Sequence, residues 1–393
     1  MQSTPTSERA HIAIFGRTNA GKSTLMNALT GQDVSIVSAE RGTTTDPVQK
    51  AMELQGMGAA VIIDTPGLDD NTLLGAARMA RTAKVLDRTD IALILFTDEG
   101  TDVEMEVVKE CRVREISIIT VIAHSDRIAN SEALREEVAA MTKTEPVVIS
   151  ALRGAGIAEL KERIATCRPN EERLITEGFC KAGDRVLLVM PQDKSAPKGR
   201  LIQPQVQTIR ELLDRGCVPM CCTPESMATA LEAYATPPEL IITDSQAFEE
   251  VYRLKPTAST LTSFSILFAR YKGDIALFLE GVKALKHLTP TSRILIAEAC
   301  THTPQNEDIG RVKLPRILRK RFGEGLLIDI VGGADYPTDL TPYDLVIHCG
   351  ACMFNRRHVL SRVERAREQG VAITNYGVIL AALTGIIDRV KTM

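Results

Sequence analysis

One stretch near the N-terminus has the residue types and spacing that bind phosphate. Residues 16–23 follow the pattern G-x-x-x-x-G-K-S and lie between an apolar run at 11–15 and a helix-forming run at 23–29. The glycines let successive backbone N–H groups face a phosphate, and the start of the helix adds partial positive charge. We therefore predict a nucleoside triphosphate site. Its predicted residues are Gly16, Asn19, Ala20, Gly21, Lys22, Ser23 and Thr24.

Two short motifs follow in the order expected of the loops that sense a γ-phosphate. In Asp64-Thr65-Pro66-Gly67 the acid can hold Mg²⁺ through water, and the glycine N–H can reach the γ-phosphate. Ser23 is a second predicted Mg²⁺ ligand, and Thr44, in the Gly42–Asp46 loop, is the third. We predict that Lys22, Thr44, Asp64 and Gly67 support hydrolysis. No residue of these loops stands out as a general base, so hydrolysis is expected to be slow.

The elements that position these loops alternate between short apolar strands and helical patterns. In the first region, strands are expected at 11–15, 59–63, 91–96, 116–123 and 146–149, which indicates a parallel doubly wound sheet. We expect a disordered N-terminus at 1–8, a first domain at 9–168, a linker at 169–183, a small α/β domain at 184–257 and a third α/β domain at 258–393. Strands of the third domain are predicted at 293–297, 326–330, 345–347 and 372–374.

Composition narrows the class of protein. The net charge is −3, aromatic residues make up 4% and tryptophan is absent, which disfavours a nucleic-acid-binding surface. No apolar run approaches the roughly 20 residues of a membrane span, and no signal peptide begins the chain. We expect a cytoplasmic protein without disulfides. Six of its nine cysteines are interpreted as structural: Cys111, Cys167, Cys180, Cys217, Cys221 and Cys222.

The other three cysteines form a pattern with two histidines. Cys300-Thr301-His302 follows one predicted strand, and His348-Cys349-Gly350-Ala351-Cys352 follows another. Because parallel strands release their chains at the same sheet edge, both segments are expected to meet there. Three thiols and a nearby imidazole suit zinc, and three thiols with an exchangeable fourth ligand suit a [4Fe–4S] cluster. A redox-active thiol pair without metal is the third alternative.

The first region resembles the translation-factor-related GTPases, and most closely the Era/TrmE branch. The resemblance rests on residues 16–25 and on the Gly42-Thr43-Thr44 loop. It implies GTP as the nucleotide and hydrolysis stimulated by K⁺, which Asn19 would help to bind. The predicted fold class is therefore α/β, with a doubly wound P-loop GTPase sheet followed by two smaller α/β domains.

One motif departs from that branch. Where those GTPases carry Asn-Lys-x-Asp, this chain has Ala123-His124-Ser125-Asp126. The retained Asp126 can accept hydrogen bonds from both guanine N–H groups. A second loop, with Ser150 and Ala151, matches the remaining base-contacting segment. We expect the preference for GTP to survive with weaker affinity.

A wider resemblance covers nearly the whole chain. Cys-x-His followed by His-Cys-x-x-Cys, an N-terminal GTPase domain and a middle segment at 190–201 are similar to the HydF family of [FeFe]-hydrogenase maturation GTPases. The resemblance implies a [4Fe–4S] cluster on Cys300, Cys349 and Cys352. The fourth ligand would be labile, and the candidates near the motif are His302, His348, Glu298 and Glu307.

The same resemblance implies a scaffold and carrier that delivers a di-iron precursor to apo-[FeFe]-hydrogenase. The implied partners are that hydrogenase, two radical-SAM maturases and a second copy of the chain, with no nucleic acid and no membrane. Two rival functions remain open: a GTPase acting in RNA modification or on the ribosome, and a regulatory GTPase stapled by zinc.

Overall fold

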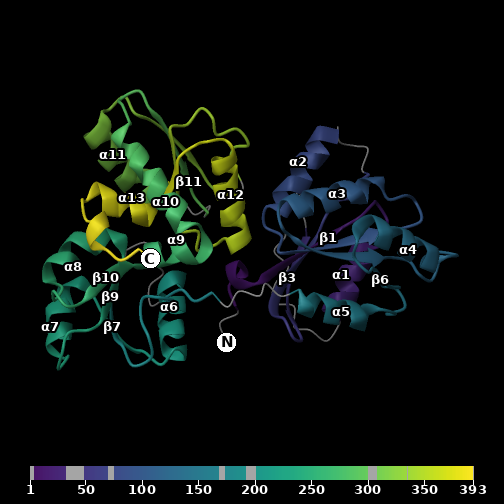
Figure 1. Cartoon of the computed structure of the whole chain (residues 1–393), viewed down its shortest axis with the longest axis horizontal. Helices are drawn as coiled ribbons and strands as arrows, with labels where there is room; N and C mark the ends of the chain where they lie inside the picture. The colour runs from purple at the N-terminus through teal and green to yellow at the C-terminus, as the bar shows by residue number, and fades with distance from the viewer. Residues whose placement is uncertain are drawn as a thin grey trace. The chain divides into compact units, whose positions relative to one another are not determined.

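The chain forms two compact units, Met1–Glu171 and Glu172–Met393, in the computed structural model. Figure 1 shows the first in purple and blue and the second in teal to yellow. The structure describes residues 4–31, 48–69, 75–167, 173–191, 201–299, 308–333 and 335–392, with only the backbone at 75–80. Five predicted features lie outside the described residues: the Gly42–Asp46 loop with Thr44, the 192–200 part of the middle segment, Cys300, His302 and Glu307.

A mixed six-stranded sheet builds the first unit. Its order is β2-β3-β1-β4-β5-β6, with β2 antiparallel to β3 and all other neighbours parallel. The strands are β1 (Ala10–Phe15), β2 (Val48–Leu54), β3 (Gly58–Asp64), β4 (Ile91–Phe96), β5 (Ser117–Ile122) and β6 (Val147–Val148). The helices are α1 (Lys22–Thr30), α2 (Gly75–Leu86), α3 (Asp102–Val113), α4 (Ser131–Thr142) and α5 (Ile157–Thr166).

Both faces of this sheet are covered by helices, which is why its central strands are continuous apolar runs. Helices α1 and α5 pack on one face, and α2, α3 and α4 on the other. The five strands predicted from the sequence are confirmed to within a residue at each end. Strand β2 was not predicted. Its sequence, Val-Gln-Lys-Ala-Met-Glu-Leu, has neither a continuous apolar run nor a strict polar–apolar alternation, and it lies at the edge of the sheet.

The second unit contains two four-stranded parallel sheets. The first has the order β10-β9-β7-β8 and the second β12-β11-β13-β14. Strands of the first are β7 (Arg185–Val189), β8 (Val218–Cys222), β9 (Leu240–Thr243) and β10 (Thr260–Ser263). Strands of the second are β11 (Arg293–Ala297), β12 (Leu327–Val331), β13 (Leu345–His348) and β14 (Ile373–Asn375).

These two sheets share one topology. In each, the second strand lies on one side of the first, and the third and fourth lie on the other. The helices are α6 (Gln203–Asp214), α7 (Met227–Glu232), α8 (Phe248–Leu254), α9 (Phe264–Lys272), α10 (Ile275–Gly281), α11 (Leu314–Phe322), α12 (Arg356–Glu368) and α13 (Tyr376–Leu383). The sequence shows no repeat, because the two sheets share the order of their strands but not their residues.

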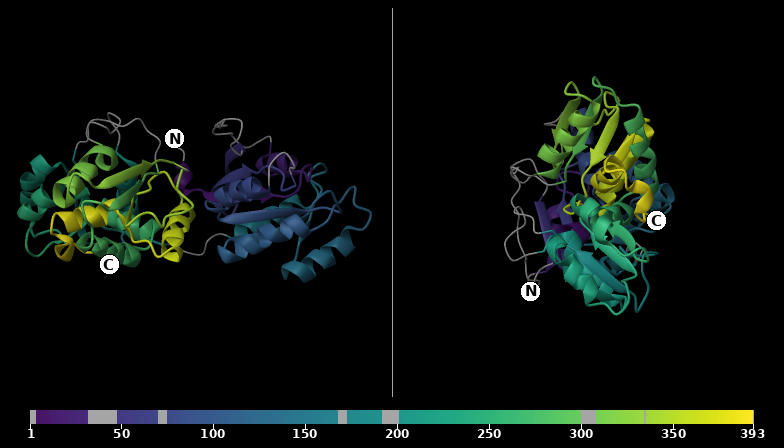
Figure 2. Two further views of the ribbon diagram at one scale, coloured as in Figure 1. Left: turned by 90° about the horizontal axis from the view of Figure 1, so that it is seen from above. Right: turned by 90° about the vertical axis from the view of Figure 1, so that its left-hand side faces the viewer.

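The division between the second and third domains differs from the expected residue 258. Strand β10 pairs in register with β9, and α9 covers the same sheet through Phe264, Leu267 and Phe268. The middle domain therefore extends to Lys272 at the end of α9. Helix α9 also packs against α12 and α13, so the two sheets of this unit are joined through it (Figures 1 and 2).

At the N-terminus, part of the segment expected to be disordered is regular. Residues Thr6–Glu8 form a 3-10 turn.

Candidate functional sites

The phosphate loop lies between β1 and α1, as predicted. Gly21 has φ 85° and Asn19 has φ 61°, both in the left-handed region, so the loop curls before the helix starts. The Lys22 ammonium donates to the carbonyl oxygens of Gly16, at 3.1 Å, and Arg17, at 2.6 Å. Burial lowers the pKa of Lys22, and the carboxylates of Asp64, Asp69 and Glu104 oppose that shift. The loop thus holds a buried cation where a phosphate would lie.

Two of the predicted Mg²⁺ ligands, Ser23 and Asp64, meet beside this loop. The Ser23 hydroxyl donates to Asp64 Oδ2 at 2.5 Å. Within the described residues the other carboxylate oxygen, Oδ1, is buried and has no hydrogen-bond partner. A hydroxyl and a half-satisfied carboxylate are the donors that Mg²⁺ prefers. These two residues therefore fit a magnesium ion.

The segment after β3 lies directly on the phosphate loop. The Leu68 N–H donates to Gly16 O at 3.1 Å, and the Thr18 N–H donates to an Asp69 oxygen at 2.6 Å. A side chain at Gly67 would overlap Thr18. Only glycine therefore fits at position 67, where the backbone lies against the phosphate loop.

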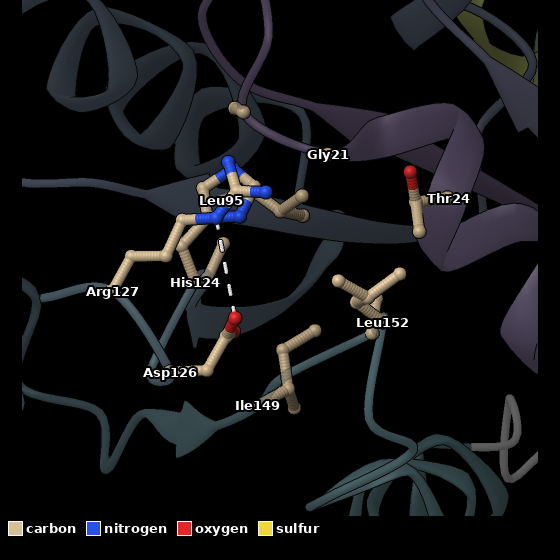
Figure 3. A pocket seen from close by; sticks show the side chains of 11 residues that line it. Gly21, Thr24, Leu95, His124, Asp126, Arg127, Ile149 and Leu152 are labelled. Atoms are coloured by element: carbon tan, nitrogen blue, oxygen red, sulfur yellow. Dashed lines mark ion pairs between the residues drawn. The ribbon is translucent and has the colours of Figure 1, made fainter.

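A pocket opens beside the loop, between the ends of β4, β5 and β6 (Figure 3). Its lining includes the predicted residues Ala20, Gly21, Thr24, Asp126 and Ala151 together with Leu95, Ala123, His124, Arg127, Ile149 and Leu152. The Ser150 hydroxyl donates to Asp126 Oδ1 at 2.6 Å, and this hydrogen bond lowers the pKa of Asp126. The carboxylate is therefore held ionised at the pocket, ready to accept hydrogen bonds.

His124 connects this pocket to the phosphate loop. Its φ is 56°, and its Nε2 lies 3.0 Å from the carbonyl oxygen of Asn19. The ring also lies so near Gly21 that a Cβ there would be 3.1 Å from Cε1. The sequence showed only that a lysine was missing from this position. The structure adds that the imidazole bonds the loop backbone and forms one wall of the pocket.

The second site lies beyond the carboxyl ends of β11 and β13. These adjacent strands pair at Ala297 and His348, and the Cys349 N–H donates to Ala297 O at 2.9 Å. Because β12 lies on the opposite side of β11 from β13, the strand order reverses between β11 and β13. Crevices at such reversals are where open α/β sheets bind ligands.

Backbone N–H groups converge on the Cys349 sulfur. The Ala299 N–H lies 3.0 Å from Sγ and the Ala351 N–H lies 3.4 Å from it. Ala351 has φ 52°, which turns the chain tightly before Cys352. Burial raises the pKa of the Cys349 thiol to about 11, whereas the two N–H groups act to lower it. Donors aimed at a sulfur suit a metal-bound thiolate, since they stabilise its negative charge.

Cys300 itself lies outside the described residues, as do His302 and Glu307. Its neighbour in the chain, Ala299, is the residue that bonds the Cys349 sulfur. Within the described ranges, which leave these three out, no group of three or more His, Cys, Asp or Glu is arranged to hold a metal ion.

Two of the predicted fourth ligands are described, and both have protein partners. His348 is 1% exposed; Nδ1 lies 2.8 Å from Cys349 O and Nε2 lies 3.2 Å from Arg362 Nη1. Burial and the Arg362 charge lower the pKa of His348 to about 3. Glu298 contacts Arg311 Nε at 2.8 Å and the Tyr376 hydroxyl at 3.4 Å. Either residue would have to exchange a protein partner to bind a metal.

Sequence reasoning missed several features of the second unit. Lys272 and Arg362, each 2% exposed, lie against the Cys349–Cys352 loop and its histidine. Cys180 and Cys217, interpreted as single structural residues, have sulfur atoms 3.6 Å apart. No local motif could reveal these contacts, because their partners lie 14 to 82 positions away in the chain.

In the described part of the chain, no helix is both long and apolar enough to cross a bilayer.

Comparisons with known proteins match each region of the chain. The dimerization domain of hydrogen maturase F matches residues 175–273, and its tetramerization domain matches residues 276–393. A 50S ribosome-binding GTPase family matches residues 11–124. The two maturase domains together cover more than half of the chain.

Individual relatives resemble the first region alone. The tRNA modification GTPase MnmE of Chlorobaculum tepidum is 34% identical over 174 residues, 43% of this chain and 36% of that protein. GTPase Era of Pasteurella multocida is 35% identical over 159 residues, 38% of this chain and 51% of that protein. The chain thus spans about a third to about half of the length of these relatives. A crystal structure of Era from Aquifex aeolicus has 23% identity and a TM-score of 0.35, covering 54% of this chain and 92% of that one.

Proposed function

Because this chain belongs to the hydrogen maturase F family, we propose that it is a GTP-hydrolysing scaffold for [FeFe]-hydrogenase maturation. In this proposal it binds a [4Fe–4S] cluster, holds a di-iron precursor as cargo and delivers it to apo-hydrogenase. Two radical-SAM maturases would supply the precursor. The observation that carries the proposal is the hydrogen bond from Ala299 to the Cys349 sulfur, which brings the residue next to Cys300 to that thiol.

Cys300, Cys349 and Cys352 are the proposed cluster ligands. Ala299, which precedes Cys300 in the sequence, bonds the Cys349 sulfur, and this contact supports a centre shared by the three cysteines. When bound, a [4Fe–4S] cluster with three thiolates supplies one iron site that a carboxylate, an imidazole or cargo can take. His302, His348, Glu298 and Glu307 remain the candidate fourth ligands. Exchange at that position is what loading and release of cargo require.

In the first unit, Lys22 would neutralise the β- and γ-phosphates, and Ser23 and Asp64 would hold Mg²⁺ with Thr44. Asn19, at the bend of the phosphate loop, is the proposed K⁺ ligand; K⁺ there would stabilise charge that develops on the phosphates. Slow hydrolysis would switch the loops after β3 and around Thr44 and so time partner binding.

A homodimer is proposed through the sheet of the middle domain. Strand β8 is an edge of that sheet, and its Val218 is 56% exposed. Helix α6, which contacts β8, presents Leu213 at 55% exposure and Val206 at 37%. At the opposite edge, Lys391 bonds Leu261 and Thr262 of β10 and so covers that strand. Apolar side chains beside an open strand edge favour pairing with a second copy.

Sedimentation of Leu213→Asp and Val218→Asp variants tests this interface. Both are expected to shift the dimer to monomer, because a buried charge at the interface is costly. Leu254→Asp, at a leucine that is 40% exposed on α8, is the matched control and should leave the dimer intact. Unchanged association of both variants would exclude this surface.

The function itself is tested by delivery. Protein purified together with the maturases is mixed with apo-hydrogenase, and hydrogen evolution is followed. Activation by the wild type and none by Cys349→Ser would support the proposal. A chain that holds zinc without sulfide and activates nothing would favour the zinc-stapled regulatory GTPase. Binding of tRNA at physiological salt would instead favour the RNA-modification alternative suggested by the GTPase relatives.

A further inference from the structure

Two buried cations contact the loop that carries the second and third cysteines. Lys272, the last residue of α9 in the middle domain, donates to Ala351 O at 3.3 Å and to Phe354 O at 2.8 Å. These carbonyls lie on either side of Cys352. The lysine therefore fixes both ends of the short segment that presents this thiol, although it comes from a different sheet.

Arg362 of α12 acts from the other side of the same loop. Its guanidinium bonds His348 Nε2 and the carbonyl oxygen of Gly333. It lies between two aromatic rings, 4.8 Å from the Tyr336 centroid and 4.6 Å from that of Phe354. Because a guanidinium can only donate, Nε2 of His348 is the acceptor and Nδ1 carries the proton. That proton is donated to Cys349 O at 2.8 Å.

The contacts of Lys272 and Arg362 reach peptide groups of the same loop. Lys272 binds Ala351 O, while the Ala351 N–H points at the Cys349 sulfur. Arg362, through His348, binds Cys349 O. The Ala351 and Phe354 carbonyls thus face Lys272, Cys349 O faces the His348 ring, and the Ala351 N–H faces sulfur. Placing a carbonyl near a thiolate would repel it, so this orientation favours an anionic centre.

From these contacts we infer that Lys272 and Arg362 are positioning residues that stabilise the anionic cluster and raise its reduction potential. This inference rests on the proposed [4Fe–4S] cluster. Reduction adds one electron to a centre that already carries thiolate charge, and a nearby buried cation stabilises the more negative state because burial limits screening. His348 has a protein partner at each ring nitrogen and would have to give one of them up to take the fourth iron position.

The test is an anaerobic redox titration of the reconstituted full-length protein, followed by electron paramagnetic resonance. Lys272→Met and Arg362→Met remove the positive charges and are expected to lower the midpoint potential of the cluster. Lys272→Gln should lower it as well, because glutamine keeps a hydrogen-bond donor but loses the charge. Lys272→Arg keeps the charge and should leave the midpoint potential at the wild-type value. The matched control is Lys255→Met, because Lys255 likewise donates to two carbonyls, those of Pro256 and Ser259, within its own turn.

The possible outcomes distinguish failure of this inference from failure of the proposed function. A wild type that binds no iron and sulfide would overturn the cluster proposal itself. A wild-type cluster whose potential is unchanged in the methionine and glutamine variants would overturn the role of the cations alone. Circular dichroism of each variant before reconstitution shows whether it folds. If the methionine variants do not fold, the comparison of Lys272→Gln with Lys272→Arg decides.

Discussion

The nucleotide site and the cysteine site occupy equivalent places, beyond the carboxyl ends of parallel strands, but they are assembled differently. In the first, a single turn from Gly16 to Ser23 carries the proposed phosphate contacts, and Asp64 joins it from the neighbouring strand of the sheet. In the second, the Cys349–Cys352 loop is oriented by Lys272 and Arg362, from helices on two different sheets. A site built from consecutive residues is visible in a sequence, whereas a site supported by distant cations is visible only in the fold.

The largest expected effect tests whether the two sites work independently. Lys22→Ala removes the cation that is proposed to neutralise the β- and γ-phosphates. GTP hydrolysis should fall by at least about a hundredfold, the scale of losing one preorganised donor to a developing charge. Iron and sulfide content should stay at the wild-type level, because the cysteine site belongs to a separate compact unit. Malachite-green phosphate release and iron analysis of the same preparation check both halves.

Loss of iron in Lys22→Ala would contradict the independence of the two sites, because it would mean that the cluster depends on the nucleotide site.

A smaller effect is expected at the base pocket. The Ser150 hydrogen bond lowers the pKa of Asp126, and Asp126→Ala removes the proposed acceptor for guanine N–H groups. Hydrogen bonds to a charged group contribute about 1.5–3 kcal/mol, so GTP affinity should fall about ten- to a hundredfold. Fluorescence titration with a labelled GTP analogue measures this change. Inosine triphosphate lacks the exocyclic amino group, and the variant should no longer discriminate against it.

An equal preference for the two nucleotides in the wild type would show that Asp126 does not read the base.

The smallest effect is expected from changing the altered guanine motif at residues 123–126. Restoring the sequence of the GTPase relatives with Ala123→Asn and His124→Lys adds an amide to the pocket and replaces the imidazole that bonds Asn19 O. One added neutral hydrogen bond contributes about 1 kcal/mol, so GTP affinity should rise by less than about tenfold. The same titration measures it. Weaker binding in the double variant would show that His124 is better suited to this pocket than lysine.

The parts that followed from sequence are those with local physical causes. Strand β4 matches its predicted bounds, 91–96, because it is an uninterrupted apolar run. The positions of Lys22 and Ser23 followed from one motif between a strand and a helix. Strands without a continuous apolar run were harder: β2 mixes polar and apolar residues, and β8 contains Pro219 and two cysteines. The contacts of Lys272 depend on how α9 packs between two sheets, which no spacing of residues encodes.

The central claim is that Cys300 shares one inorganic centre with Cys349 and Cys352. Iron and acid-labile sulfide, counted per chain after anaerobic reconstitution of the wild type and of Cys300→Ala, test it most directly. The account predicts about four of each in the wild type and a sharp loss in the variant. Equal iron and sulfide in both proteins, or zinc without sulfide in the wild type, would contradict it.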